Sequence, residues 1–256
     1  MRGLSGRHSG PCESPGAILL TDRTARRPGA RRRRSSGEPA AILGYTLVVT
    51  WDSERFASRY DRFVRPFERR VAAPVRRRLV SPLRGDVLDL GAGTGANFPF
   101  FPPTVGRVVA LEPDAAMLRR AAAKRASCPV PLEIVRAQGE RLPFPDSSFD
   151  AAVATLVLCT VRDLPAALAE VRRVLRPGGS LVLFEHVAAR NAPGRWLQHA
   201  VQPLWGPRAA GCQLTRDTPA AVRAAGFTFE RIERGWLWPY LLPSSPAVIG
   251  VACAPA

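Results

Sequence analysis

Cysteine and histidine are scarce in this chain. Its 256 residues include five cysteines and three histidines, and no two cysteines form a Cys-x-x-Cys pair. An odd number of scattered cysteines predicts neither a disulfide framework nor a zinc site. Because His8, His186 and His199 show no metal-ligand spacing, we expect no bound metal, and the cysteine usage favours a cytoplasmic location.

Long apolar runs are also missing. The apolar stretch over residues 40–51 contains Gly44, Thr46 and Thr50, and it is shorter than the roughly twenty residues that span a bilayer. We therefore expect no transmembrane segment, and no small-residue cleavage site indicates a secretory signal.

Lysine is nearly absent, although the chain is strongly basic. The formal net charge is +16, yet all but one of the 37 basic residues are arginines, the exception being Lys124. Basic and aromatic residues do not interleave in a recognisable nucleic-acid motif, so we do not expect a nucleic-acid partner. The charge keeps an RNA-binding protein as an alternative and leaves peripheral contact with an anionic membrane open.

Residues 1–48 form a segment rich in Arg, Ser, Gly and Pro, with four consecutive arginines at Arg31 to Arg34. This composition predicts a disordered leader. Its bias is typical of GC-rich coding, which leads to the hypothesis that the natural start lies near Val49. An intact mass of the native protein that matches all 256 residues would exclude this hypothesis.

Residues 49–85 are expected to form capping helices ahead of one α/β domain over residues 86–256. Apolar residues recur at intervals of three or four, as in an amphipathic helix, and prolines at 66 and 74 are expected to interrupt it. The apolar positions are Phe56, Tyr60, Phe63, Phe67, Val71, Val75 and Leu79.

A glycine loop follows a short apolar strand. Residues 87–95 read Val-Leu-Asp-Leu-Gly-Ala-Gly-Thr-Gly, and the glycines permit a tight turn and close approach of a ligand to the backbone. Asp89 lies at the carboxyl end of the strand, where open α/β sheets bind ligands. With Glu112 downstream, the loop also fits a dinucleotide-binding fingerprint, so a nicotinamide oxidoreductase is an alternative.

The acid beside the loop favours a different cofactor. A pyrophosphate gains nothing from a neighbouring carboxylate, whereas the amino-acid end of S-adenosylmethionine carries an ammonium group that Asp89 can meet. A second strand ends at Glu112, 21 residues after Gly91, and its carboxylate can accept both ribose hydroxyls. Pro113 is expected to start the next helix, in which Met117 covers the adenine edge.

A third motif, residues 137–150, reads Ala-Gln-Gly-Glu-Arg-Leu-Pro-Phe-Pro-Asp-Ser-Ser-Phe-Asp. Together with the glycine loop, Glu112-Pro113 and Leu175-Arg-Pro-Gly-Gly179, it resembles the class I S-adenosylmethionine-dependent methyltransferases of the type 11 group, which includes quinone-biosynthesis enzymes. The resemblance covers the core motifs at 86–186. The group commonly has Asp where this chain has Gln138, whose amide oxygen can still accept a hydrogen bond from adenine.

Further segments narrow the resemblance. They are similar to segments of the methyltransferase-like thiol S-methyltransferases known from animals, which implies methyl transfer to a small alkyl thiol. Quinones, phenols and other small-molecule acceptors methylated on O or C stay open, because specificity varies within this superfold. The segments are Gly95-Ala-Asn-Phe98, Thr155-Leu-Val-Leu-Cys-Thr-Val161, Glu185-His-Val187 and Gly211-Cys-Gln-Leu-Thr-Arg216.

The resemblance implies a Rossmann-like α/β fold, with a seven-stranded, mostly parallel sheet, an antiparallel last strand and helices on both faces. It implies cofactor contacts at Asp89, Gly91, Ala92, Gly93, Gly95, Asn97, Glu112, Pro113, Met117, Gln138, Gly139, Glu140, Thr155 and Leu156.

The remaining elements follow from periodicity and capping residues. We expect strands at 132–135, 150–157, 180–186, 227–235 and 247–253, and helices at 164–175 and 219–225, the second capped by Thr218. Residues 188–218 contain prolines and tryptophans and are expected to form an irregular insertion on the substrate side.

The implied chemistry is direct displacement at a sulfonium methyl group. The leaving group is a neutral thioether, so no acid is needed to expel it, and alignment of the reactants supplies most of the acceleration. A thiol, with an ordinary pKa of about 8.5, benefits from a base. His186, at the end of the fifth strand, is the candidate base, and Tyr60, Cys159 and Cys212 are expected to line the acceptor pocket.

Overall fold

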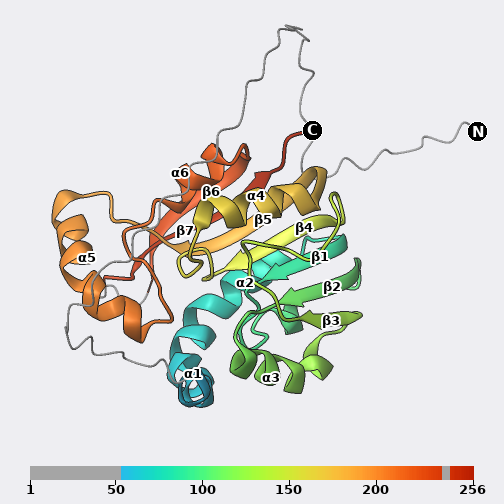
Figure 1. The fold of residues 1–256 in the computed structure, drawn as a ribbon, viewed down its shortest axis with the longest axis horizontal. Coiled ribbons are helices and arrows are strands. Elements are labelled where there is room, and N and C mark those ends of the chain that lie inside the picture. Colours follow the sequence, from blue (N-terminus) through green and yellow to red (C-terminus); the bar gives the residue numbers. More distant parts are fainter. Residues whose placement is uncertain (1–52, 238–242) are drawn as a thin grey trace, which may run out of the picture.

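Seven strands form one sheet in the order β3-β2-β1-β4-β5-β7-β6 in the computed structural model, which describes residues 53–237 and 243–256 (Figure 1). The leader expected at residues 1–48 and the alternative start near Val49 lie outside the described residues. The strands are β1 (Gly85–Leu90), β2 (Val105–Leu111), β3 (Leu132–Val135), β4 (Phe149–Thr155), β5 (Leu175–His186), β6 (Thr228–Trp236) and β7 (Pro246–Cys253).

The pairing confirms the expected topology. Strands β1 to β5 pair in parallel, and β7 is antiparallel to both β5 and β6. A dinucleotide-binding dehydrogenase would place a parallel strand beside β5, so the antiparallel β7 removes the support for a nicotinamide oxidoreductase.

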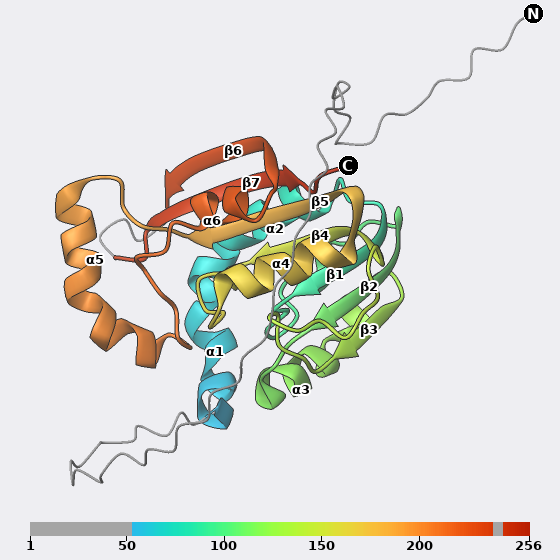
Figure 2. The same cartoon turned by 45° about the horizontal axis from the view of Figure 1, so that its top comes forward.

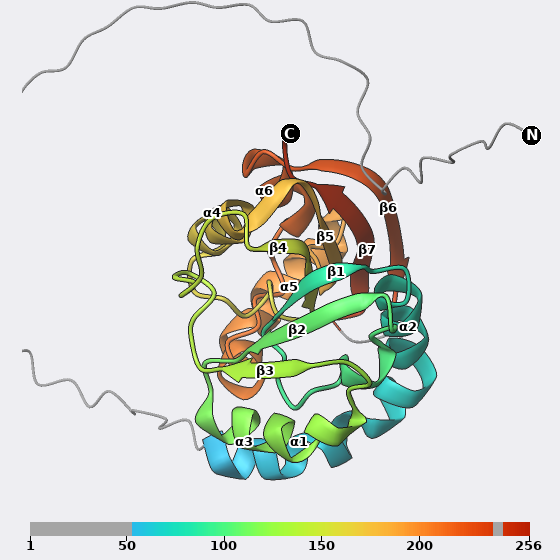
Figure 3. The same ribbon diagram turned by 90° about the vertical axis from the view of Figure 1, so that its right-hand side faces the viewer.

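Helices cover both faces of the sheet (Figure 3). Helices α4 (Leu164–Val174) and α6 (Thr218–Ala224) lie on one face, and α2 (Ala73–Val80) and α3 (Ala115–Ala123) lie on the other. Because side chains alternate along a strand, Leu88 packs into the core on the α4 side and Val87 packs into the core beneath α2. Two apolar cores therefore hold the strands, and their carboxyl ends are left to carry polar groups.

The N-terminal helix continues through both of its prolines. Helix α1 (Ser53–Phe67) runs into a π-helical turn, η1 (Glu68–Ala72), and then into α2. Pro66 and Pro74 flank this wider turn, which accommodates them without ending the helix. The expected apolar stripe is wrong at Phe63, which is 86% exposed, because Ala57 lies on the buried face instead.

Two expected helix starts are corrected by the structure. Helix α3 is capped by Asp114, which accepts hydrogen bonds from the backbone of Ala116 and Met117, so Pro113 precedes the helix. Helix α6 is capped by Asp217. The cap was expected at Thr218, but the aspartate one residue earlier reaches the amide of Ala220. Both helices therefore use the stronger acidic cap.

The segment expected to be irregular contains a 14-residue helix, α5 (Ala192–Trp205). Asn191 caps it, and Pro193 lies in its first turn, where a missing N–H costs nothing. Figures 1 and 2 show α5 and α1 at the edge of the molecule where the parallel strands end. No helix of the described residues is long and apolar enough to cross a membrane.

Candidate functional site

The glycine loop turns tightly at the carboxyl end of β1. Gly91 and Gly93 have φ angles of +62° and +58°, in the left-handed region that favours glycine. A Cβ at Gly91 would lie 2.1 Å from Val157 Cγ2, whereas a Cβ at Gly93 would meet only the carbonyl oxygen of Gly91 at 4.0 Å. Gly91 is therefore required by packing, and Gly93 faces open space.

Asp89 is fully buried at the end of β1. Its Oδ1 accepts a hydrogen bond of 2.7 Å from Asn97 Nδ2, and its Oδ2 has no hydrogen-bond partner among the described residues. Burial raises the pKa of Asp89 to about 7, although the hydrogen bond from Asn97 and the nearby Arg76 act in the opposite direction. One carboxylate oxygen is thus held in place while the other lacks a donor.

Arg76 completes this network from helix α2. Its guanidinium is buried and donates to Asn97 Oδ1 at 2.8 Å, to Thr155 Oγ1 at 2.5 Å and to Glu68 Oε1 at 2.8 Å. Arg76 was not predicted as a site residue from the sequence. Its only signal was a position on the same helix face as Leu79, one arginine among many, because the partners come from distant segments.

Glu112 lies just after β2 and joins it to the glycine loop. Its two carboxylate oxygens accept hydrogen bonds of 2.9 Å from the backbone N–H groups of Gly93 and Asp114. Burial raises its pKa, and these two donors oppose that shift. The expected contact with ribose hydroxyls stays a prediction, and the structure adds a role in fixing the loop.

The third motif contributes groups of different kinds. Gln138 is exposed, Gly139 is buried, and Glu140 Oε1 accepts backbone hydrogen bonds from Arg162 at 2.8 Å and Asp163 at 3.2 Å. Glu140 therefore ties the motif to the start of α4. Its expected cofactor contact, like that of half-buried Met117, remains a prediction.

The end of β4 returns the chain toward the same network. Thr155 is buried and accepts hydrogen bonds from both Arg76 and Asn97. Leu156 has a φ of +59°, a strained backbone for a leucine, and its N–H donates to the carbonyl of Phe184 at 2.7 Å. Because the register places Thr155 opposite Phe184, the two strand ends stay close.

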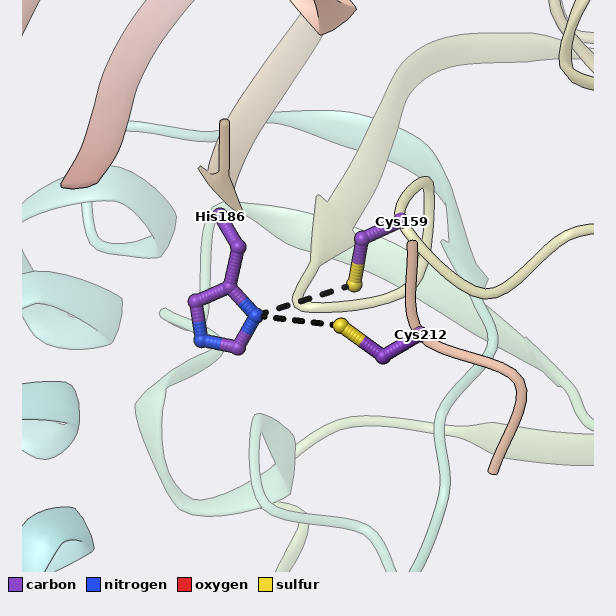
Figure 4. A group of neighbouring side chains, drawn as sticks. All are labelled: Cys159, His186 and Cys212. Carbon is purple, nitrogen blue, oxygen red and sulfur yellow. Dashed lines mark hydrogen bonds between the residues drawn. The ribbon is translucent and has the colours of Figure 1, made fainter. Parts of the chain in front are cut away.

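Cys159, His186 and Cys212 converge beside this network (Figure 4). His186 Nδ1 lies 3.9 Å from Cys159 Sγ and 3.6 Å from Cys212 Sγ. Both cysteines are almost fully buried, and His186 is partly exposed. No pattern in the sequence indicated this cluster, because its three residues lie in distant segments: after β4, at the end of β5 and after α5.

The two thiols of the cluster differ in acidity. A hydrogen bond from Cys159 is the largest cause that lowers the pKa of Cys212 to about 5, and His186 acts in the same direction. The same hydrogen bond and burial raise the pKa of Cys159 well above its ordinary value. Cys212 is therefore the more acidic of the two thiols.

Glu185 holds the loop that carries Cys159. Its Oε1 accepts hydrogen bonds of 2.8 Å from the N–H groups of Val157 and Leu158, and its Oε2 accepts one of 3.2 Å from Cys159. The side chain is fully buried, and burial raises its pKa to about 7 against these donors. Glu185 acts as a clamp on the loop after β4.

Comparisons with known proteins show which family this chain belongs to. A model described as a methyltransferase domain matches residues 88–183. Thiol S-methyltransferase TMT1B of Homo sapiens is 38% identical over 172 residues, which cover 65% of this chain and 69% of that protein. Thiol S-methyltransferase TMT1A of Homo sapiens is 35% identical over 164 residues, covering 61% and 67% respectively. The chain belongs to the class I S-adenosylmethionine-dependent methyltransferases.

A solved structure agrees with the methyltransferase fold. The crystal structure of a putative methyltransferase from Bacillus halodurans C-125 matches with a TM-score of 0.60 at 17% identity, covering 73% of this chain and 99% of that one. At this identity the match supports the fold alone.

The residues present at the site fit S-adenosylmethionine, the cosubstrate of this methyltransferase. The buried Asp89 Oδ2 without a partner is the kind of acceptor that the ammonium group of the cofactor requires, and the open space at Gly93 admits a ligand against the backbone. Asp89 and Asn97 would hold the amino-acid end. Glu112 would hold the ribose.

Helix α1 is fastened to the glycine loop of the methyltransferase. Asp61 accepts a hydrogen bond of 2.6 Å from Thr94 Oγ1 and forms an ion pair of 2.7 Å with Lys124. A cavity of about 410 Å³ lies beneath this contact, lined by Tyr60, Asp61, Val64, Arg65, Glu68, Arg69, Ala73, Arg76, Thr94, Ala96, Pro99, Phe100 and Lys124. Burial raises the pKa of Tyr60, and Arg76 opposes the shift.

Replacing Gly93 by alanine tests whether a ligand lies against this backbone. We expect Gly93→Ala to cost about 1–2 kcal/mol of unfolding free energy, because φ is positive. We also expect it to weaken S-adenosylmethionine binding roughly tenfold, because the new methyl group occupies the open space. Calorimetric titration and urea unfolding measure the two effects.

Gly226→Ala provides the matched control for backbone strain. Gly226 also has a positive φ, of +92°, and its added Cβ would meet only the movable end of Arg172 at 2.9 Å. It precedes β6, away from the carboxyl ends of the parallel strands. A similar loss of affinity in both variants would show that Gly93 has no special relation to the cofactor.

Proposed function

We propose that this methyltransferase transfers the methyl group of S-adenosylmethionine to the sulfur of a small alkyl thiol. The observation that carries the proposal is the 38% identity to a relative named a thiol S-methyltransferase over 172 residues. The geometry supports it, because His186 and two cysteines form a sulfur-rich cluster where β4 and β5 end.

The residues of the chain divide the work of this reaction. When bound, S-adenosylmethionine supplies an electrophilic methyl group on a sulfonium. Asp89 orients its amino-acid end, and helix α1, fastened by Asp61 to Thr94, caps the site and excludes water. His186 ends β5 and is partly exposed, and when no metal is bound it would serve as the base that takes the proton of the thiol.

A turnover assay with paired acceptors tests the proposal. We expect ethanethiol to be methylated on sulfur, with S-adenosylhomocysteine formed in equal amount, while ethanol, the alcohol with the same carbon skeleton, is not. Quinols, phenols and amines belong in the same panel, with products identified by mass spectrometry. Methylation of a quinol or phenol with no turnover of any thiol would overturn the thiol assignment and leave the fold unaffected.

A further inference from the structure

Three potential ligand atoms converge where β4 and β5 end. The Sγ atoms of Cys159 and Cys212 and a ring nitrogen of His186 all lie within 4.8 Å of one another. Figure 4 shows the ring nitrogen of His186 directed between the two sulfur atoms. Among residues 53–237 and 243–256, no fourth His, Cys, Asp or Glu side chain joins the group.

The spacing matches the edges of a tetrahedral zinc site. With Zn–S of about 2.3 Å and Zn–N of about 2.0–2.1 Å, a sulfur and a nitrogen bound to one ion lie about 3.5–3.6 Å apart. The two sulfur–nitrogen distances here are 3.6 Å and 3.9 Å. An ion could therefore be bound by small side-chain adjustments.

The charges and the donor types also suit zinc. Two thiolates and a neutral imidazole would balance the 2+ charge of the ion, and thiolate with imidazole is a donor set that selects zinc. The alternative is to bury two thiols side by side with a histidine. A metal accounts for all three donors at once.

Hydrogen bonds to backbone carbonyl groups hold the two loops that carry the cysteines in place. The carbonyl of Cys159 accepts a 2.8 Å hydrogen bond from the N–H of Gln213, and the carbonyl of Cys212 accepts one of 3.0 Å from Gln202 Nε2. Arg216 donates to the carbonyl of Leu158 at 2.6 Å. Such support keeps the ligands in position without a metal, as a preformed site requires.

We propose that Cys159, His186 and Cys212 bind one Zn²⁺ ion, and that its fourth position takes the sulfur of the acceptor thiol. Three protein ligands with one open position is the arrangement of catalytic zinc sites, whereas structural sites are closed by four. The first half of this proposal stands on the cluster alone. The second half rests on the proposed function.

The ion would lower the pKa of the acceptor thiol and keep its sulfur nucleophilic at neutral pH. The thiol displaces a water molecule from zinc and loses its proton to solvent. Its sulfur then uses a lone pair to bond the methyl carbon as the bond from that carbon to the sulfonium sulfur breaks, with the electron pair going to the departing thioether. The methylated product is a neutral thioether, a weaker ligand than a thiolate, so water replaces it.

Metal analysis and cobalt substitution test the site without reference to activity. We expect the full chain, purified without a histidine tag, to hold about one Zn²⁺ by elemental analysis. After the zinc has been removed with a chelator, we expect added Co²⁺ to give thiolate-to-cobalt charge-transfer bands and intense tetrahedral d–d bands. Cys159→Ser, Cys212→Ser and His186→Ala should each lower metal affinity roughly tenfold or more.

Cys128→Ser is the matched control, because Cys128 is a free and partly exposed cysteine outside the cluster. It should leave the cobalt spectrum unchanged. A wild-type protein that shows no thiolate-to-cobalt bands overturns the metal site, and this readout does not depend on whether any variant folds. A non-reduced mass 2 Da below that of the reduced protein, with protection of both cluster cysteines from alkylation, would show a disulfide in place of a metal site.

Adding ethanethiol to the cobalt protein tests the binding of the acceptor sulfur separately from the binding of the metal. A change in the d–d bands that ethanol does not cause supports sulfur binding at the fourth position. Unchanged bands would overturn the acceptor role while the metal site stands. Methylation of ethanethiol by a protein that binds neither Zn²⁺ nor Co²⁺ would overturn the metal site and leave the proposed function intact.

Discussion

Asp89→Asn is expected to weaken the binding of S-adenosylmethionine roughly 10- to 100-fold, as expected when a hydrogen bond worth about 1.5–3 kcal/mol to a charged group is lost. The new amide would keep an oxygen to accept from Asn97, so the local fold should persist. Its second group would be an N–H₂ donor, which cannot pair with the ammonium of the cofactor. Calorimetric titration at pH 8 measures the loss.

The wild-type protein should bind the cofactor more tightly as pH rises through about 7. The pKa of Asp89 is raised to about 7 by burial, and the cationic ammonium group pairs with the ionised form. The ionised fraction changes about tenfold between pH 6 and pH 8 for such a group, so affinity should rise by about the same factor. Titrations in buffers with different ionisation enthalpies should show proton release at pH 6.

The stability of Asp89→Asn separates a binding effect from a folding effect. The ionised Asp89 is costly to bury without the cofactor, so its contribution to folding stability declines as pH rises from about 4 to about 7. The neutral variant should therefore be at least as stable as the wild type at pH 8. A variant with both lower stability and unchanged affinity for S-adenosylmethionine would contradict the assigned role.

Glu185→Ala is expected to lower the free energy of unfolding by about 3 kcal/mol. The change leaves three N–H groups without an acceptor, those of Val157, Leu158 and Cys159, of which the last two are buried. Each buried N–H group without an acceptor costs about 1–3 kcal/mol. Removing a buried carboxylate offsets part of that cost. Urea unfolding monitored by circular dichroism gives the value.

Two further variants grade this effect. Glu185→Gln can keep its oxygen at the Oε1 position, which serves two of the three donors, so its loss should be smaller. Glu140→Ala also removes an acceptor of two backbone N–H groups, but those of Arg162 and Asp163 are within reach of water and should cost about 1 kcal/mol or less. Equal losses for Glu140→Ala and Glu185→Ala would contradict the clamp.

Most of the strands and helices could be predicted from the sequence, because the patterns that indicate them depend on neighbouring residues. Strand β3 was predicted at its observed limits, and α4 to within one residue, since alternation, apolar spacing and the glycines after Arg176 depend only on neighbouring residues. Helix α5 was missed because its prolines and tryptophans have low helix propensity. Asn191 and Pro193 supply the cap and first turn that offset it.

Several residues of the candidate site could be predicted from the sequence, but the contacts between them could not. The acids at the ends of β1 and β2 were identified because strand ends are visible as apolar runs that stop at a carboxylate. The contacts among them were not visible, since Arg76 reaches Asn97 and Thr155 across 21 and 79 residues of sequence. Spacing cannot report contacts between segments so far apart.

The sequence by itself determined the family and the parallel order of the central strands, because each depends on a short motif followed by a predictable element. Only the tertiary structure decided that the buried Arg76 donates to Asn97 and Thr155, and that the side chains of Cys159, His186 and Cys212 come together. These side chains come from α2, from the loop after β1, from the ends of β4 and β5 and from the segment after α5. They meet only because the packing of the whole sheet and its helices brings these segments together.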